Sequence, residues 1–232
     1  MQILRTDNLP FTVRVVATED DLRQSVNVRH QAYARHVPSL AASLRIPEAA
    51  DLTPGSVVLL AQSKLDGVAL GTIRIQTNDR GPLALESSLS LPERFTGKRL
   101  AEATRLGVVS DRVGRLAKLA LFKAFYRYCV EDKIDAMVIA ARSPLDRQYE
   151  SFLFQDVLPG GAFVPMQHAA GIPHRVLSLS VDVAEKIWRY GGHPHYDFFV
   201  TTHHPDIDLS GCKHAVKSLR QQLDIGQTYV AA

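Results

Sequence analysis

The 232-residue sequence has little cysteine and no long apolar run. Its two cysteines, Cys129 and Cys212, form no Cys-x-x-Cys or paired pattern, so a disulfide scaffold is excluded and reduced thiols are expected. Cys129 falls in an apolar helical pattern and is expected to be buried. No apolar run approaches the ~18 residues of a membrane-spanning helix. The first residues also lack a signal-peptide core. These absences predict a cytoplasmic protein with no transmembrane segment.

Strong charge of one sign is also missing. The formal net charge is +3 and the isoelectric point is near 8.9. That balance, without a basic stripe interleaved with aromatic residues, predicts no nucleic-acid partner. The nine histidines fall in no His-Glu-x-x-His or helical i, i+4 pattern, so no metal site is expected. No Gly-x-Ser-x-Gly motif is present, which disfavours a serine hydrolase.

The composition that remains is that of an ordinary globular protein. Hydrophobic residues make up 46% and charged residues 22% of the chain, which is enough to fill a core. The length fits a single domain over residues 1–232, with a C-terminal extension from about residue 193. Two small domains are the less favoured alternative.

The first half of the chain alternates strand and helix patterns. A β-rich, alternating stretch predicts a strand over Phe11–Thr18. Thr18 can cap the helix that follows, with acids in its first turn and Arg29 toward one edge of its apolar face. Strands over Ser56–Gln62 and Val68–Thr77 flank an Asp-Gly pair, which is a hairpin signal.

The second half predicts a strand–helix–strand unit. A strand over Leu100–Val109 leads to a helix over Asp111–Glu131, with Ser110 as the expected N-cap. The apolar run Ile134–Ala141 fits a central strand buried on both faces. The remaining expected elements are a short helix over Ser143–Phe154, a strand over Pro173–Val181, a helix from Val181 stopped by glycines, and a tail of loops with a helix around Cys212–Leu223.

This order predicts an α/β fold whose mixed sheet is antiparallel early and parallel late. It is similar to the acyl-CoA N-acyltransferase (GNAT) arrangement, which implies a splayed central strand and helices on both faces of the sheet. Four stretches, VRHQAYARH, EAADLTPGSVVLLAQ, GTIRIQT and EATRLGVV, occur in the order found in autoinducer (acyl-homoserine-lactone) synthases. The aromatic-rich stretch that those synthases carry after the first helix is absent.

The later stretches YESFLF and YDFFVTTHHPDIDL resemble the N-acyl amino acid synthases, relatives on the same fold. The resemblance covers roughly Val13 to Leu209. It implies an acyltransferase that joins a long acyl group, carried as a thioester on the phosphopantetheine of an acyl carrier protein, to the amino group of an amino acid. It also implies no bound cofactor, no metal and no covalent enzyme intermediate.

Glu102 is the expected catalytic base, acting directly or through a water. A carboxylate half buried in a sheet can have a raised pKa, which suits an amine near neutral pH. Residues 102 and 105 point to opposite faces of a regular strand, so both serve one site only if a bulge lies near them. An inert Glu–Arg pair at a sheet edge is the structural alternative.

Arginines and an aspartate are the candidates for binding the acceptor. Arg29, Arg74 and Arg105 can each hold a carboxylate through two hydrogen bonds. Asp51 could bind the acceptor ammonium or orient an arginine. Alternatively, an Arg–Asp–Arg–Glu network only fixes the first helix on the sheet.

The start of the long helix is the candidate donor site, because free N–H groups at a helix N-terminus suit a phosphate. Arg112, Gly114 and Arg115 match only loosely the Arg/Gln-x-x-Gly-x-Gly/Ala pattern of acetyl-CoA enzymes of this fold, which disfavours acetyl-CoA. Backbone amides of Val108 or Val109 are the expected thioester contacts. A solvated basic helix start is the structural alternative for the arginines.

The acyl chain would need an apolar tunnel. The candidate lining residues are Met137, Ile139, Phe152, Phe154 and Phe163, all of which also fit a plain core role. Three other functions stay open from sequence: an acyl-homoserine-lactone synthase, an acetyl-CoA-dependent N-acetyltransferase, and a non-catalytic module that binds acyl carriers.

Overall fold

The computed structural model describes residues 5–230, of which residues 224–230 are described through their backbone only. The chain divides into two compact units built from interleaved segments. Unit 1 comprises Met1–Asp7, Gln76–Thr104 and Phe125–His203, and unit 2 comprises Asn8–Ile75, Arg105–Ala124 and His204–Ala232. Strands β4 (Ala69–Thr77) and β5 (Leu100–Val108) and helix α3 (Arg112–Glu131) each begin in one unit and end in the other.

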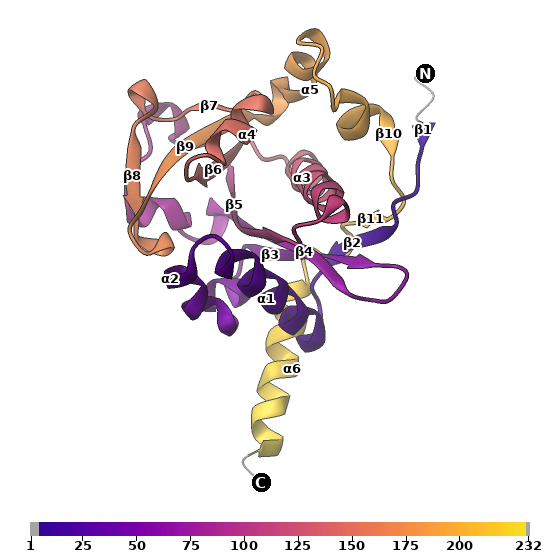
Figure 1. Cartoon of the computed structure of the whole chain (residues 1–232). Coiled ribbons are helices and arrows are strands. Elements are labelled where there is room, and N and C mark those ends of the chain that lie inside the picture. The colour runs from indigo at the N-terminus through magenta and orange to yellow at the C-terminus, as the bar shows by residue number, and fades with distance from the viewer. Residues whose placement is uncertain (1–4, 231–232) are drawn as a thin grey trace. The chain divides into compact units, whose positions relative to one another are not determined.

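Unit 2 is organised around strands in the order β11-β2-β3-β4-β5. Its further elements are β2 (Phe11–Val15), α1 (Glu19–Ala34), α2 (Pro38–Ala41), the 3₁₀ turns η1 (Ala42–Arg45) and η2 (Ala49–Leu52), β3 (Ser56–Ser63), β11 (Ile207–Asp208) and α6 (Ala215–Val230). Strand β2 pairs antiparallel with β3, and β11 pairs parallel with β2. Figure 1 labels the helices and strands among these elements.

Helix α1 forms as its sequence predicts. The hydroxyl of Thr18 accepts a hydrogen bond from the Asp21 N–H, and three acids occupy the first turn. Leu22 and Val26 point into an apolar cluster that also holds Leu219 of α6. The other members of the cluster are Val16, Val58 and Leu60, with Leu52 and Ala69 packed against it. Packing of these buried side chains holds α1 against the strands of unit 2.

The expected hairpin is present, with β3 and β4 adjacent in the sheet. Gly67, the glycine of the Asp-Gly pair, has a φ of 71°, a conformation that a glycine adopts at little cost. The Asp66 carboxylate accepts a hydrogen bond from the Val68 N–H at 3.2 Å and tightens the turn. Leu65 at the tip is almost fully exposed.

Unit 1 contains the strand order β5-β6-β9-β7, with β8 paired to β9. Its helices and strands are β1 (Arg5–Thr6), β6 (Ala136–Ala141), α4 (Asp146–Ser151), β7 (Gln155–Asp156), β8 (Phe163–Met166), β9 (Ile172–Ser180), α5 (Val181–Tyr190), the π-helical turn η8 (Asp197–Thr201) and β10 (Thr202–His203). Short 3₁₀ turns fall at η3 (Asn78–Arg80), η4 (Ala84–Ser87), η5 (Glu93–Phe95), η6 (Pro159–Gly161) and η7 (Gln167–Ala169).

Strand β6 is the central strand that its apolar sequence predicts. It pairs parallel with the first half of β5 and antiparallel with β9 over its whole length. The parallel register runs from Leu100 opposite Ala136 to Ala103 opposite Ile139. Since α3 connects β5 to β6, the expected parallel βαβ crossover is confirmed, and the mixed α/β fold class with it.

The cap of α3 corrects one expectation. The helix begins at Arg112, and the Asp111 carboxylate accepts a hydrogen bond from the Gly114 N–H at 2.7 Å. Asp111, not Ser110, is therefore the N-cap. Both residue types cap helices, so local preference could not separate two adjacent candidates.

The C-terminal region of unit 1 holds a cluster of rings rather than plain loops. Phe199 lies with its ring centroid 5.3 Å from Trp188 and 5.6 Å from Phe152. His193 stacks on Phe199 at 6.0 Å, and its Nδ1 accepts a hydrogen bond from the His195 N–H at 3.1 Å. Its Nε2 therefore carries the proton and donates to the Ser151 carbonyl at 2.8 Å. Burial lowers the pKa of His193, which keeps the ring neutral.

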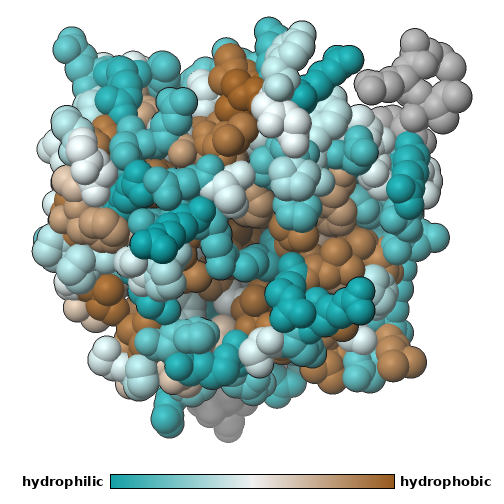
Figure 2. All heavy atoms as spheres, turned by 45° about the horizontal axis from the view of Figure 1, so that its top comes forward, coloured by the Kyte–Doolittle hydropathy of each residue, from teal (hydrophilic) through white to brown (hydrophobic). Residues whose placement is uncertain are grey.

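Among the described residues, no helix has the length and apolarity to span a membrane. The face in Figure 2 is mostly hydrophilic, with hydrophobic residues interspersed. Exposed apolar side chains of this kind are common on folded proteins.

Candidate functional site

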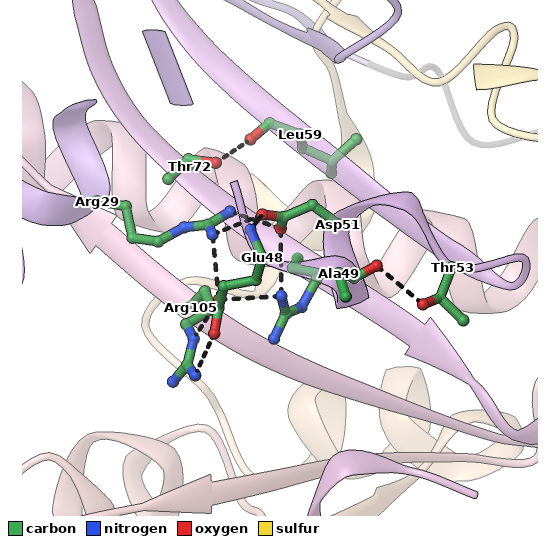
Figure 3. A network of polar contacts seen from close by, with 9 residues as sticks. Arg29, Glu48, Ala49, Asp51, Thr53, Leu59, Thr72 and Arg105 are labelled. Carbon is green, nitrogen blue, oxygen red and sulfur yellow. Dashed lines mark hydrogen bonds and ion pairs between the residues drawn. The ribbon is translucent and has the colours of Figure 1, made fainter. Parts of the chain in front are cut away.

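Five charged side chains of unit 2 form one network of hydrogen bonds and ion pairs (Figure 3). They are Arg29 from α1, Glu48 and Asp51 from the segment around η2, Arg74 from β4 and Arg105 from β5. Three elements far apart in sequence therefore deliver guanidinium groups to two carboxylates that lie three residues apart.

Asp51 is the inner carboxylate of the network. It accepts hydrogen bonds from Arg29 Nη1 and Nη2 at 3.0 and 2.9 Å, and from Arg74 Nη1 at 3.2 Å. The side chains of Arg29 and Asp51 are 0% exposed and that of Arg74 is 2% exposed. Arg29, which the sequence placed toward one edge of the apolar face of α1, is thus fully buried together with Asp51.

Glu48 is the outer carboxylate, and it is 23% exposed. Arg105 Nε and Nη2 each donate to one of its oxygens at 2.7 Å, a two-point contact of fixed geometry. Arg29 Nη1 and Arg74 Nη1 also donate to Glu48 Oε2, at 3.3 and 3.1 Å.

Local backbone geometry holds the two acids together. Glu48 is the N-cap of η2, and Asp51 at the third position accepts a hydrogen bond from the Glu48 N–H at 2.9 Å. The Asp51 N–H in turn donates to the Glu48 carbonyl, so the segment Glu-Ala-Ala-Asp is fixed as one turn. Sequence reasoning named Asp51 but missed Glu48, although the acid-x-x-acid spacing, in which the second side chain can accept the backbone N–H of the first residue, was the available signal.

The acids of the network are held ionised. Burial alone would raise the pKa of Asp51, but the hydrogen bond and charge of Arg29 and the charge of Arg74 outweigh it, so that pKa lies below its usual value. The pKa of Glu48 is lowered in the same way, against burial, chiefly by Arg105. Burial also lowers the pKa of Arg74, which nonetheless stays a cation because arginine titrates far above neutral pH.

The backbone of β5 is irregular at Arg105, whose φ is 55°. A left-handed conformation costs a non-glycine residue on the order of 1 kcal/mol. The positive φ interrupts the extended backbone of the strand at this residue. The expected irregularity near residues 102 and 105 is therefore present.

A close approach of α1 places Arg29. A Cβ on Gly107 would lie 3.0 Å from Ala32 Cβ and 3.2 Å from Arg29 Cα. Glycine at position 107 thus lets α1 lie directly against β5, which brings the Arg29 side chain to the acids of η2.

Glu102 lies in unit 1 and its side chain is fully buried. Its Oε2 accepts a hydrogen bond from the Leu85 N–H at 3.2 Å, so η4 fixes the orientation of the carboxylate. Val138 of β6 is its neighbour in the parallel register. Its role as base stays a prediction.

The expected thioester contacts differ from each other in their surroundings. The Val109 N–H donates to the Leu70 carbonyl at 2.9 Å, so it is engaged within the sheet of unit 2. The Val108 carbonyl accepts a hydrogen bond from Arg35 Nη2 at 2.6 Å. The Val109 N–H is therefore engaged, and the role of the Val108 amide stays a prediction.

The start of α3 combines exposed cations with a tight turn. Arg112 and Arg115 are exposed, as a basic docking rim requires. A Cβ on Gly114 would lie 2.0 Å from the Val109 carbonyl oxygen, so only glycine fits there. Because Asp111 already accepts the Gly114 N–H, one of the free helix amides is occupied by a carboxylate.

The remaining candidates lie in unit 1. Met137, Ile139, Phe152 and Phe154 are buried, whereas Phe163 is 45% exposed and does not belong with them. The described residues include no group of three or more His, Cys, Asp or Glu side chains that could hold a metal ion.

Comparisons with known proteins identify the family of the chain. Residues 24–170 match the family model described as N-acyl amino acid synthase FeeM. The solved structure of FeeM, an N-acyl amino acid synthase from uncultured soil microbes, superimposes with a TM-score of 0.62 at 17% identity, over 76% of this chain and 93% of that chain. No curated protein sequence matches the chain.

Two acyl-homoserine-lactone synthases share the fold. BjaI, a CoA-dependent enzyme, gives a TM-score of 0.56 at 16% identity over 90% of this chain and 98% of that chain. LasI gives a TM-score of 0.56 at 19% identity over 78% of this chain and 95% of that chain. The family match covers more than half of the chain and includes the residues of the unit 2 network. The chain is an acyltransferase that belongs to the FeeM N-acyl amino acid synthase family.

Proposed function

We propose that the protein joins a long acyl group from an acyl carrier protein to the amino group of a free amino acid. Family membership supports an acyl donor and an amine acceptor. The single observation that carries the acceptor assignment is the two-point contact between Arg105 and a partly exposed carboxylate. That geometry is the one in which arginine recognises the carboxylate of an amino acid.

The reaction needs a proton acceptor, and Glu102 is assigned that role. The acceptor arrives as an ammonium ion and is not nucleophilic until it loses a proton. Glu102 takes this proton, directly or through a water. The amine then attacks the thioester carbonyl, and the C–N bond forms. The C–S bond breaks, and the second proton of the nitrogen passes to the sulfur, so that the thiol leaves on the carrier. The Leu85 N–H fixes the base through Oε2.

The oxygen of the thioester gains negative charge as the amine attacks. A backbone N–H directed at that oxygen lowers the barrier. We assign this role to Val108, since the Val109 N–H is already bonded to Leu70.

The start of α3 supports a carrier donor over free CoA. The Asp111 carboxylate adds negative charge where a CoA pyrophosphate would need free amides. Exposed Arg112 and Arg115 match the acidic surface of a carrier protein.

The test supplies purified protein with acyl carrier thioesters or with acyl-CoAs of several chain lengths, acetyl-CoA among them, and with a mixture of amino acids and S-adenosylmethionine. Mass spectrometry identifies the product. The proposal expects an N-acyl amino acid formed faster from the carrier thioester. An acyl lactone formed from S-adenosylmethionine, or an acetylated amine formed from acetyl-CoA, would replace it with one of the alternative functions.

A further inference from the structure

The two carboxylates of the network have different surroundings. Asp51 is buried and bonds to both buried arginines. Glu48 is partly exposed, and its shortest contacts are to Arg105. If Glu48 moved away, Asp51 would still accept hydrogen bonds from Arg29 and Arg74. Glu48 is therefore the carboxylate whose departure leaves each buried arginine with a carboxylate partner.

The backbone at Glu48 stays in place when its side chain turns. Its N–H donates to Asp51 Oδ2 and its carbonyl accepts from the Asp51 N–H, each at 2.9 Å. The segment just before it is on the surface, and Ile46 is 69% exposed. Rotation of one side chain toward solvent is thus enough to release Arg105.

We propose that Glu48 is an internal stand-in for the acceptor carboxylate. In the free enzyme it occupies the Arg105 guanidinium, and the carboxylate of the incoming amino acid replaces it there. This inference rests on the proposed function, and it makes Glu48 the residue that selects acceptors with a free carboxylate. An amine without a carboxylate cannot displace Glu48, so it leaves the site closed.

The competition has a measurable consequence. For a ligand that must displace Glu48, the apparent dissociation constant is the intrinsic one divided by the fraction of time that Arg105 is open. If Glu48 holds Arg105 for roughly 90% of the time, removing its charge tightens acceptor binding about tenfold. The expected change appears in KM, with kcat within about twofold, because the contact exists before the chemical step.

The experiment compares the wild type with Glu48→Gln. The probes are two matched pairs, tyrosine with tyramine and leucine with isoamylamine, measured by turnover with acyl carrier thioester and by calorimetric binding without donor. We expect Glu48→Gln to bind the amino acids about tenfold more tightly and the amines unchanged. Glu48→Asp, whose shorter side chain reaches Arg105 poorly, is the second variant and should change in the same direction.

A matched control is available in unit 1. Asp156 is held by Arg175 through the same two-point geometry, with contacts of 2.5 and 2.7 Å. Asp156→Asn should leave the preference for amino acids over amines unchanged. Thermal unfolding of each variant shows that it is folded.

Two results would overturn the inference. An unchanged ratio of amino acid to amine affinity in Glu48→Gln would make Glu48 a purely structural residue. Weaker binding of both the amino acid and the amine would instead place Glu48 on the acceptor ammonium. Binding that shifts as expected without any acylated product would refute the proposed function and leave the inference standing. Acylated product formed without the shift in binding would refute the inference about Glu48 and leave the proposed function standing.

Discussion

Asp51 and Arg29 form a two-point ion pair with both side chains shut off from solvent. The two hydrogen bonds measure 3.0 and 2.9 Å, and Arg74 adds a third at 3.2 Å. A buried pair of this kind contributes little when intact, but loss of one partner strands the other charge. Asp51 is thus the residue on which the stability of the network depends most.

Asp51→Asn should lower the free energy of unfolding by about 3–5 kcal/mol, because Arg29 and Arg74 lose their buried counter-charge and keep only their contacts to the partly exposed Glu48. Urea unfolding followed by circular dichroism measures this. Asp79→Asn is the control, since the Asp79–Arg99 pair is 35–40% exposed and such pairs contribute about 0–1 kcal/mol. Equal effects of the two substitutions would contradict the assignment.

The same pair predicts a pH dependence. The pKa of Asp51 is lower in the folded protein than its usual value, so its contribution is complete above the unfolded pKa of about 4. The contribution is lost as the pH falls through the folded pKa. The stability difference between wild type and Asp51→Asn should therefore be constant from pH 8 to about 5 and shrink below about 4. A stability difference between the two proteins that grows as the pH falls would contradict the prediction.

His193 predicts a second, separate pH effect in unit 1. Its folded pKa is lowered by burial, so below about pH 6.5 the unfolded chain binds protons that the folded chain does not. The wild type should lose stability between pH 7 and 5 more steeply than His193→Gln does. Parallel curves for the two proteins over that range would show that the ring is not held neutral.

The cap of α3 gives a local test. Asp111→Ala should lower the unfolding free energy by about 1 kcal/mol, since the Gly114 N–H loses its acceptor. Ser110→Ala should change it by less than about 0.5 kcal/mol. A larger loss of stability in Ser110→Ala than in Asp111→Ala would show that Ser110 is the N-cap, as the sequence pattern predicts.

Local patterns predicted most of the fold. Thr18 caps α1, and the Asp66–Gly67 pair closes the hairpin, because neighbouring residues determine both features. The apolar run of β6 predicted a strand buried on both faces for the same reason.

The site was less accessible to sequence reasoning, because its contacts join distant residues. Glu48 and Arg105 are 57 positions apart, and no sequence pattern around either residue indicates that they are in contact. Helical periodicity placed Arg29 toward one edge of the apolar face of α1 but could not show that it is fully buried, because its counter-charge on Asp51 lies 22 positions away. The η8 turn was missed because the rings that pack on its Phe199 come from distant positions, Phe152 just after α4 and Trp188 in α5.

The most direct test of the account is the turnover number of Glu102→Gln with acyl carrier thioester and amino acid. Glutamine keeps an oxygen for the Leu85 N–H and cannot take the proton of the ammonium. The account predicts a kcat about 10²–10⁴-fold below that of the wild type, in a variant with the same thermal unfolding midpoint. A folded Glu102→Gln protein that forms amide at the wild-type rate would contradict the assignment of Glu102 as the base.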